Sequence, residues 1–273
     1  MDDIDRFLSE DLGEEGDVTS DVLFTKHTAH AIIIAKEDCI VAGLEEAQQV
    51  FKKLGLVATS LVKDGSAVKK STIVIEITGQ ARPILKGERL ALNIIGRMSG
   101  IATETKKIVD RCRKINPRVM IAATRKTTPG FRIFEKKAVI LGGGEPHRYG
   151  LFDAVIIKDN HLKIIGSVEE AIRIIKSKIH DKIIEIEVEN ESDALSAARM
   201  NVDVIMLDNL DPIIGKIITR KIREINPDIL IEVSGGITGD NIEKYASFAD
   251  RISLGYLTHS IKNKDFSLEI FKN

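Results

Sequence analysis

A cationic stretch lies between residues 123 and 161 and contains a run of three glycines at 142–144. Its basic side chains are Arg125, Lys126, Arg132, Lys136, Lys137, His147, Arg148 and Lys158. Guanidinium groups match the planar geometry of carboxylates, and ammonium groups act as compact point charges for phosphates. A buried core does not call for so many cations, and a solvated face does not call for three consecutive glycines. The stretch therefore predicts one wall of an anion-binding site.

Carboxylates follow in two later apolar runs. Glu185, Glu187 and Glu189 share one face of a predicted strand because side chains alternate along a strand, and Asp208 ends the next run. Carboxylates on one buried face must meet lysines, hydroxyls, water or a metal ion. Oxygen ligands beside phosphates suit Mg²⁺. The alternative interpretation is a structural ion-pair network with Lys126 and Lys158.

Two glycine-containing turns resemble phosphate cradles. Ser234, Gly235 and Gly236 follow a predicted strand and precede a helix, where backbone N–H groups can approach an anion. Residues 254–255, followed by Thr-His-Ser at 258–260, repeat the arrangement one strand later. His161 and His259 can equally be caps or satisfied polar groups. A Schiff base at Lys158 is a further interpretation, because lysines at barrel strand ends form them.

Short apolar runs alternate with helical patterns from residue 117 onward. The runs cover 119–123, 154–158, 183–188, 202–207, 229–233 and 251–255, and the helical patterns cover 167–178, 191–200, 212–225 and 239–247. Strand followed by helix, repeated, predicts a parallel sheet, and six such units suggest a barrel. The polar residues named above fall at or near the carboxyl ends of these runs. In an α/β barrel the loops at that end converge on one mouth.

The first hundred residues have a mixed pattern. A helix at 4–12 closed by Gly13, strands within 30–43, a helix at 44–55 and two strands joined by Asp64 and Gly65 predict a small α+β unit. A helical pattern covers 83–115, and Gly96 with the pair at 99–100 predicts a break into two helices. By spacing alone, Arg89 is an exposed helix arginine. Residues 264–272 alternate like a final strand.

Bulk composition limits the classes of partner. The 273 residues carry 40 Lys+Arg and 41 Asp+Glu, a net charge of −1, so we expect neither nucleic acid nor an anionic membrane as a partner. Cys39 and Cys112 have no Cys-x-x-Cys spacing, the start of the chain has no apolar signal region, and no run approaches the ~18 apolar residues of a spanning helix. These features predict a cytoplasmic protein.

A series of motifs, in order from Glu10 to Ser260, resembles quinolinate phosphoribosyltransferases. They include G-E-R-x-x-L-N-x-x-x-R-x-S-G-I-A-T, T-R-K-T-x-P-G-x-R, G-G-G-x-x-H-R-x-G-L-x-D, I-K-D-N-H, E-x-E-V, L-D-N, S-G-G-I and G-x-x-T-H-S. The resemblance implies an incomplete parallel α/β barrel (residues 101–260) with an N-terminal α+β sandwich domain (residues 1–100, joined by the tail 261–273). It also implies a homodimer with shared active sites, with a hexamer as a larger alternative.

The same resemblance implies a reaction. Quinolinate and phosphoribosyl pyrophosphate, with Mg²⁺, would give nicotinate mononucleotide, pyrophosphate and carbon dioxide. The implied catalytic residues are Lys126, Lys158, Glu187 and Asp208, with Glu187 and Asp208 also serving Mg²⁺ directly or through water or substrate. The implied substrate-binding residues are these four together with Arg89, Thr124, Arg125, His147, Arg148, Ser234, Gly235, Gly236, Ser253, Leu254, Gly255 and His259.

The resemblance changes two of the interpretations drawn from spacing. Arg89 would act from the partner subunit, and the Schiff base at Lys158 becomes the weaker reading. Tyr256 departs from the small residue expected after Gly255 and could narrow the phosphate pocket or add a hydrogen bond. The rival functions are a phosphoribosyltransferase for another base and a barrel that binds an anionic ligand without catalysis.

Overall fold

The computed structural model describes residues 2–272, which divide into two compact units. The first unit contains the chain up to Lys106, the segment Thr128–Gly143 and the chain from Ser260. The second contains Lys107–Thr127 and Gly144–His259. The segment 128–143, which we expected within the barrel domain of residues 101–260, thus groups with the first unit.

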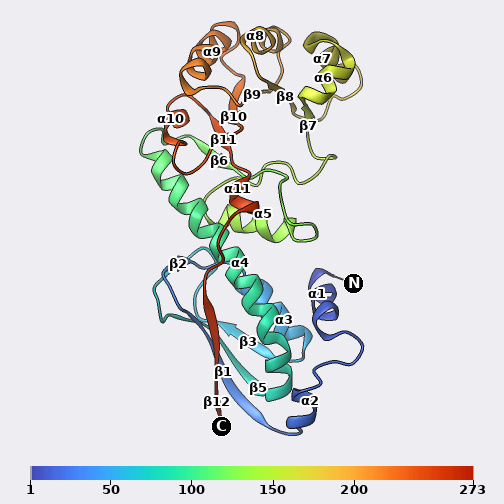
Figure 1. Cartoon of the computed structure of the whole chain (residues 1–273), viewed down its shortest axis with the longest axis vertical. Coiled ribbons are helices and arrows are strands. Elements are labelled where there is room, and N and C mark those ends of the chain that lie inside the picture. The colour runs from blue at the N-terminus through green and yellow to red at the C-terminus, as the bar shows by residue number, and fades with distance from the viewer. Residues whose placement is uncertain (1, 273) are drawn as a thin grey trace. The chain divides into compact units, whose positions relative to one another are not determined.

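The second unit is built on a six-stranded sheet in which all pairs are parallel. Its strand order is β6 (Met120–Ala122), β11 (Arg251–Ser253), β10 (Leu230–Ser234), β9 (Val204–Asp208), β8 (Ile184–Val188) and β7 (Val155–Ile157). All six predicted strands are confirmed. Within the described residues no pairing joins β6 to β7, so the sheet stays open between its edges and the barrel is incomplete (Figure 1).

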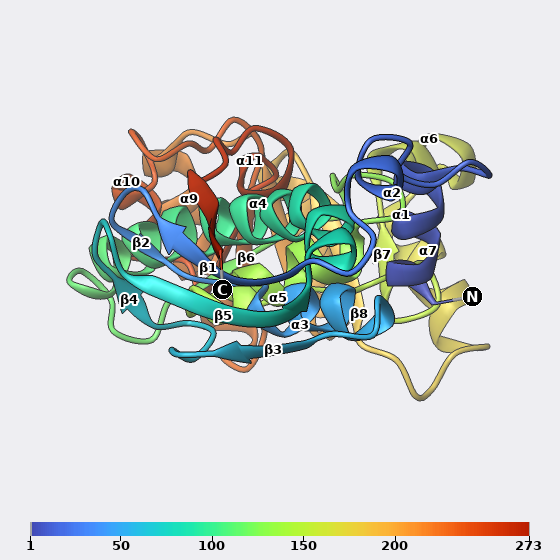
Figure 2. The same ribbon diagram turned by 90° about the horizontal axis from the view of Figure 1, so that it is seen from below.

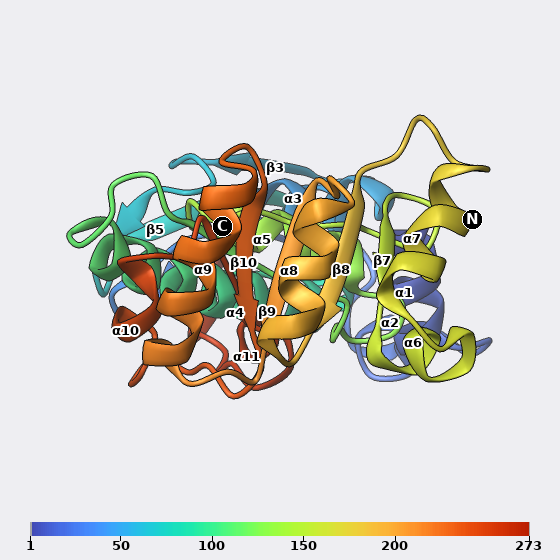
Figure 3. The same ribbon diagram turned by 90° about the horizontal axis from the view of Figure 1, so that it is seen from above.

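At least one helix follows each strand from β7 to β11. These helices are α6 (Asp159–Ile165), α7 (Val168–Lys176), α8 (Glu191–Arg199), α9 (Pro212–Ile225), α10 (Glu243–Ala246) and α11 (Tyr256–His259). Figure 3 shows α8 and α9 side by side along β8, β9 and β10. Ser167, Asn190 and Asp211 begin α7, α8 and α9, and each side chain accepts a backbone N–H of the first turn. Aliphatic side chains from the strands and helices form one core.

The first unit is built on a four-stranded antiparallel sheet of order β12 (Phe266–Lys272), β1 (Thr28–Ala35), β5 (Ile73–Gln80) and β3 (Val57–Ser60). Figure 2 shows β1, β5 and β3 together with α3 (Leu44–Lys53). The core includes Ile33, Phe51 and Ile95, from β1, α3 and α4 (Ala81–Arg113). The remaining elements are α1 (Asp3–Leu12), α2 (Ser20–Leu23), α5 (Arg132–Leu141) and the pair β2 (Cys39–Ile40) and β4 (Ala67–Val68).

The predicted break within residues 83–115 is wrong, because α4 is one helix of 33 residues. Glycine is needed at the two positions that suggested the break for another reason, which is the close approach of the C-terminal tail. A Cβ at Gly100 would lie 2.4 Å from the carbonyl oxygen of Lys262, and one at Gly96 would lie 2.9 Å from that of Lys264. Lys264 also donates its N–H to the carbonyl of Gly96 at 2.9 Å. Glycine therefore lets the C-terminal tail approach the helix without interrupting it.

The predicted turn at Asp64 and Gly65 is confirmed, with Ser66 donating its N–H to the Lys63 carbonyl at 3.1 Å. β3 and β5, on either side of it, pair antiparallel, while the short strand β4 between them pairs with β2. The Asp64 carboxylate also accepts the backbone N–H of Leu44 at 3.0 Å and that of Glu45 at 3.3 Å. Asp64 thus satisfies the first turn of α3, where Gly43 has no side chain to do so.

Candidate active site

The predicted site residues of the second unit lie at the carboxyl ends of its parallel strands. Thr124 to Lys126 follow β6, Lys158 follows β7, and Glu187 lies one residue before the end of β8. Asp208, Ser234 and Ser253 end β9, β10 and β11. Because all six strands run in the same direction, these side chains lie at one end of the sheet. Arg89, by contrast, is exposed on α4 in the first unit.

An ion pair joins the ends of β7 and β8. The Lys158 ammonium contacts the Glu187 carboxylate, whose side chain is only 11% exposed. This is one of the contacts expected in the ion-pair interpretation. A recess of about 270 Å³ beside it is lined by further carboxylates, from Asp159, Glu189 and Asp193. The strand ends therefore gather acidic groups next to a paired lysine.

Asp208 completes the acidic side of the site. Burial, and then the Glu187 carboxylate, raise the pKa of Asp208. Its Oδ2 accepts a hydrogen bond from the Asn209 amide at 2.6 Å, and in the sheet Asp208 is the register partner of Ser234. Carboxylate oxygens are the ligands that Mg²⁺ prefers, and a divalent cation relieves repulsion between neighbouring carboxylates. Glu187 and Asp208 therefore fit the ion that the family resemblance implies.

The glycines after β10 are required by close backbone approach. Gly235 has φ 83°, and a Cβ there would lie 2.3 Å from Asn209 Oδ1. Gly236 has φ 59°, which also favours glycine. Asn209 donates its N–H to the Ser234 carbonyl at 3.0 Å, while α9 is capped by Asp211. Asn209 therefore supports the turn after β10 and does not cap α9.

A second close approach follows β11. A Cβ at Gly255 would lie 2.9 Å from Lys126 Cδ and 3.3 Å from His259 Nε2, so these two side chains converge on the turn. Thr258 Oγ1 donates to the Lys126 carbonyl at 2.7 Å and ties the segment after β6 to α11. Tyr256 packs against the hydrophobic core of the unit. Lys126, Gly255 and His259 are thus brought together.

Two arginines and His147 form the cationic side. Burial, and then the charge of Arg125, lower the pKa of Arg148, so the two guanidinium groups lie close enough to repel each other. An anion between such groups relieves that repulsion. His147 adopts φ 53°, and its Nδ1 accepts the N–H of Arg148 at 2.7 Å. Its Nε2 lies 3.3 Å from Glu232 and 3.5 Å from Glu185.

Glu232 was missed by the sequence analysis. Its side chain is fully buried in β10 and contacts His147, Arg251 and Ser253. Burial acts to raise the pKa of Glu232, but these three neighbours hold it below its ordinary value. Glu185 differs, because burial and then the Glu232 charge raise its pKa. The signal in the sequence is a single glutamate inside the otherwise apolar run 229–233.

Several cations of the stretch 123–161 do not belong to this group. Arg132, Lys136 and Lys137 lie on α5 in the first unit. Lys136 is fully buried, and Lys137 pairs with Glu45 at 2.5 Å and Glu46 at 2.6 Å. The charge of Lys137 is therefore matched by two carboxylates without an anion.

His161 and Gly142, in the same stretch, have structural roles. His161 Nδ1 accepts the N–H of Lys158 at 2.8 Å, which confirms its capping interpretation. Gly142 ends α5 where a Cβ would lie 2.6 Å from the Ala102 carbonyl oxygen. The first glycine of the run 142–144 is thus explained by close packing against α4.

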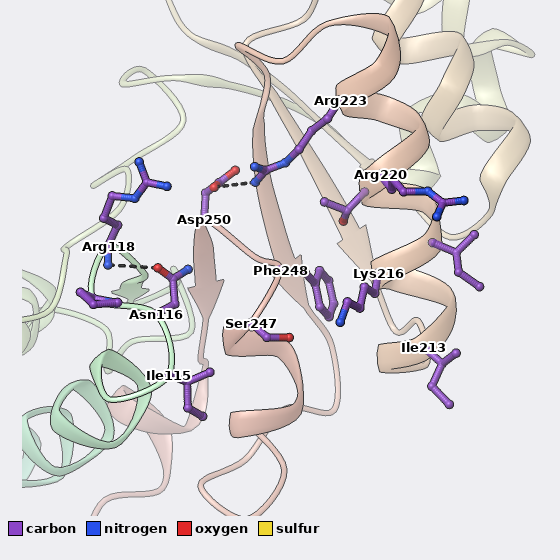
Figure 4. Close-up of a pocket in the computed structure, with 13 residues that line it drawn as sticks. Ile115, Asn116, Arg118, Ile213, Lys216, Arg220, Arg223, Ser247, Phe248 and Asp250 are labelled. Atoms are coloured by element: carbon purple, nitrogen blue, oxygen red, sulfur yellow. Dashed lines mark hydrogen bonds and ion pairs between the residues drawn. The ribbon is translucent and has the colours of Figure 1, made fainter.

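A groove of about 740 Å³ lies away from these residues, between α9 and the segments that precede β6 and β11. Figure 4 shows its lining side chains, including Arg118, Lys216 and Phe248. Arg223 and Asp250 form an ion pair of 2.8 Å across it. None of the predicted site residues lines this groove, so its size does not make it the candidate active site.

Two family models match the chain almost end to end. The model of the quinolinate phosphoribosyl transferase N-terminal domain matches residues 17–99, and that of the C-terminal domain matches residues 101–269. The chain belongs to the quinolinate phosphoribosyl transferase family. The family resemblance, the fold class and the phosphoribosyltransferase class expected from the motifs are thereby confirmed.

Relatives of this family occur in archaea, bacteria and eukaryotes. A probable carboxylating nicotinate-nucleotide pyrophosphorylase of Archaeoglobus fulgidus is 43% identical over 260 residues, 94% of this chain and 99% of the relative. The human carboxylating nicotinate-nucleotide pyrophosphorylase is 36% identical over 246 residues, 89% of this chain and 82% of the relative. The crystal structure of NadC from Streptococcus pyogenes aligns with a TM-score of 0.92 at 35% identity, over 99% of this chain and 95% of that one.

Among residues 2–272, no helix has both the length and the apolar character needed to cross a membrane.

Proposed function

We propose that this chain transfers the phosphoribosyl group of phosphoribosyl pyrophosphate to quinolinate, with loss of carbon dioxide, in de novo NAD biosynthesis. The products are nicotinate mononucleotide, pyrophosphate and carbon dioxide. Family membership and the names of the relatives support this reaction. The main structural support for this reaction is that cationic and acidic side chains lie together at the carboxyl ends of six parallel strands. A dianionic base and a sugar that develops positive charge need these two environments.

In this proposal the cations hold quinolinate and the acids face the ribose. Arg125, Lys126, His147, Arg148 and Lys158 bind the two carboxylates of quinolinate, so that its ring nitrogen faces the anomeric carbon. The nitrogen lone pair forms the new bond as the bond to pyrophosphate breaks, and oxocarbenium-like charge builds on the ribose. Glu187 and Asp208 stabilise that charge. The same two carboxylates would hold Mg²⁺, which would neutralise charge on the pyrophosphate leaving group.

The remaining residues complete the proposed site. Ser234 to Gly236 and Ser253 to Gly255 hold the 5′-phosphate with backbone N–H groups and hydroxyls, with Thr124 and His259 beside them. Once the ring nitrogen is quaternary, the bond from C2 to its carboxylate breaks. The pyridinium ring accepts the electron pair, carbon dioxide leaves, and a proton then adds at C2. The charged ring thus serves as the electron sink for the decarboxylation.

We infer that the working form is a homodimer in which Arg89 of the partner subunit joins the quinolinate site, with a hexamer as the larger assembly. The exposed position of Arg89 on α4 supports this role, because the side chain is available to a second chain. The cytoplasmic location stays a prediction from the sequence.

Purified protein incubated with carboxyl-labelled quinolinate, phosphoribosyl pyrophosphate and Mg²⁺ should release labelled carbon dioxide, and chelation of Mg²⁺ should stop the release. No release from quinolinate, with turnover of another base, would support the rival phosphoribosyltransferase. Tight quinolinate binding with no turnover of any base would support the rival barrel that binds an anion without catalysis.

A further inference from the structure

Glu232 lies beneath the candidate site with no exposure to solvent. Its Oε1 accepts a hydrogen bond from the Ser253 hydroxyl, and its Oε2 accepts one from Arg251 Nη1 at 3.1 Å. The same Oε2 lies 3.3 Å from His147 Nε2. An unpaired buried carboxylate is strongly unfavourable, so this arrangement persists because three donors surround one acceptor group. Glu232 does not reach the surface of the site itself.

The three donors come from two separate segments. Arg251 and Ser253 lie on β11, next to β10 in the sheet, and Arg251 is the register partner of Glu232. His147 lies in the loop after α5. Backbone hydrogen bonds hold this loop beside β6, from Glu145 N–H to the Ile121 carbonyl at 2.8 Å and from Ala123 N–H to the Glu145 carbonyl at 2.9 Å. One carboxylate therefore links a loop on the cationic side to a strand end on the phosphate side.

We propose that Glu232 is a positioning residue that fixes His147 for quinolinate and Ser253 for the 5′-phosphate. The inference rests on the proposed function, which assigns these two ligands to the two residues. Ser253 gives its only hydroxyl hydrogen to Glu232, and His147 directs Nε2 at the same carboxylate. Loss of this acceptor would let the imidazole turn beside quinolinate and let the end of β11 move its backbone N–H groups beside the 5′-phosphate. The groups that bind the two substrates therefore both depend on Glu232 for their positions.

The donor arrangement requires a carboxylate and disfavours a metal ion. His147, Glu185 and Glu232 offer ligand atoms within 4.8 Å of one another, but the Arg251 guanidinium already contacts the Glu232 oxygen that faces His147. A divalent cation there would meet a fixed positive charge.

A glutamine in place of Glu232 keeps the shape of the side chain but turns one acceptor into an N–H donor. That donor would face a group that also donates. Glu232→Gln therefore removes a hydrogen bond of Glu232 without changing the size of the side chain.

The experiment is steady-state kinetics of Glu232→Gln with each substrate varied in turn. We expect the KM for quinolinate and the KM for phosphoribosyl pyrophosphate each to rise about tenfold, the effect of losing one charge-assisted hydrogen bond, with kcat reduced less. Glu145→Gln is the matched control, since Glu145 also contacts Arg251 but neither His147 nor Ser253. Both KM values should stay near those of the parent in this control.

A double-mutant cycle separates positioning from general loss of structure. In a Ser253→Ala background, Glu232→Gln should still raise the KM for quinolinate but should no longer raise that for phosphoribosyl pyrophosphate. In a His147→Ala background, Glu232→Gln should still raise the KM for phosphoribosyl pyrophosphate but should no longer raise that for quinolinate. If Glu232→Gln does not fold, Glu232→Asp keeps the charge on a shorter side chain, and we expect a smaller rise of both KM values.

Unchanged KM values in a folded Glu232 variant of an active parent would overturn this inference alone, as would a loss of thermal stability with both KM values unaffected. A parent chain that does not turn over quinolinate overturns the proposed function, and this inference with it. The two failures are distinguished by the activity of the parent.

Discussion

At the scale of single residues, the parallel sheet brings together charged side chains that lie far apart in the sequence. Glu187 and Lys158 were expected because each follows or ends an apolar run, and they contact each other. Glu232 was not expected, because one glutamate in an apolar run has no partner within the sequence window. Its donors lie 19, 21 and 85 residues away, so only the sheet register brings them together.

Replacement of Glu187 by glutamine tests the acidic side of the site. Glu187→Gln removes the charge that we assign to stabilising the ribose, so kcat should fall about 100-fold with the fold intact. Glu189→Gln is the matched control, because Glu189 lies two residues later in the same recess but is exposed. A fall of similar size in both variants, measured as carbon dioxide release, would argue for a general effect of charge.

The two cysteines give a pH-dependent prediction. Burial raises the pKa of the Cys39 and Cys112 thiols to about 11. Because the thiolate is the reactive form, alkylation of the folded protein at pH 8 should be roughly 100-fold slower than that of the unfolded chain. Between about pH 9 and 11 the folded state holds more protons than the unfolded state, so stability should fall as pH rises through this window. Rapid native labelling at pH 8, detected by mass spectrometry, would contradict this.

At the scale of elements, the strands of the second unit were predicted well and α4 was not. Buried parallel strands are continuous apolar runs, so each strand carries its own signal. The glycines of α4 carry a signal that depends on another part of the chain, since Gly96 and Gly100 allow the backbone at Lys262 to Lys264 to approach. The glycines suggested a break in the helix, whereas they are explained by a contact with a segment more than 160 residues later.

Gly100→Ala separates these two explanations by the sign of its effect. Helix propensity alone would stabilise the protein by up to ~1 kcal/mol. The contact with Lys262 predicts the opposite, because the new Cβ would lie 2.4 Å from a carbonyl oxygen and force the tail away, at a cost of about 1–3 kcal/mol. Urea denaturation gives the free energy of unfolding directly. A stabilised variant would show that the close approach does not determine the residue.

At the scale of the whole molecule, the order of the motifs predicted the architecture of the chain better than apolar periodicity did. Apolar periodicity suggested closure into a parallel barrel, whereas the sheet is open between β6 and β7 in the described residues. The incomplete barrel followed from the family resemblance. Packing groups the segment 128–143 with the first unit, which its helical pattern could not show because that pattern does not indicate which core a helix joins. Spacing within a single chain also left Arg89 as an ordinary surface residue, since the role proposed for it requires a second chain.

The shared site that we propose predicts complementation between inactive chains. Arg89→Ala should remove the residue that one subunit contributes, and Lys126→Ala should inactivate the site that receives it. Mixed dimers then contain one site with neither substitution, so activity should recover toward one quarter of the parent when the chains associate at random. Differently tagged chains allow the heterodimer to be isolated. An isolated heterodimer without activity would show that the site is not shared in this way.

The most direct test of the proposed reaction is the fate of each carboxylate of quinolinate. Substrate labelled with ¹³C in the 2-carboxylate or in the 3-carboxylate is incubated with phosphoribosyl pyrophosphate, Mg²⁺ and the protein, and both products are analysed by mass spectrometry. We predict that the 2-carboxylate label leaves as carbon dioxide and that the 3-carboxylate label stays in nicotinate mononucleotide. A ribosylated product that keeps both labels, or release of the 3-carboxylate label, would contradict the mechanism.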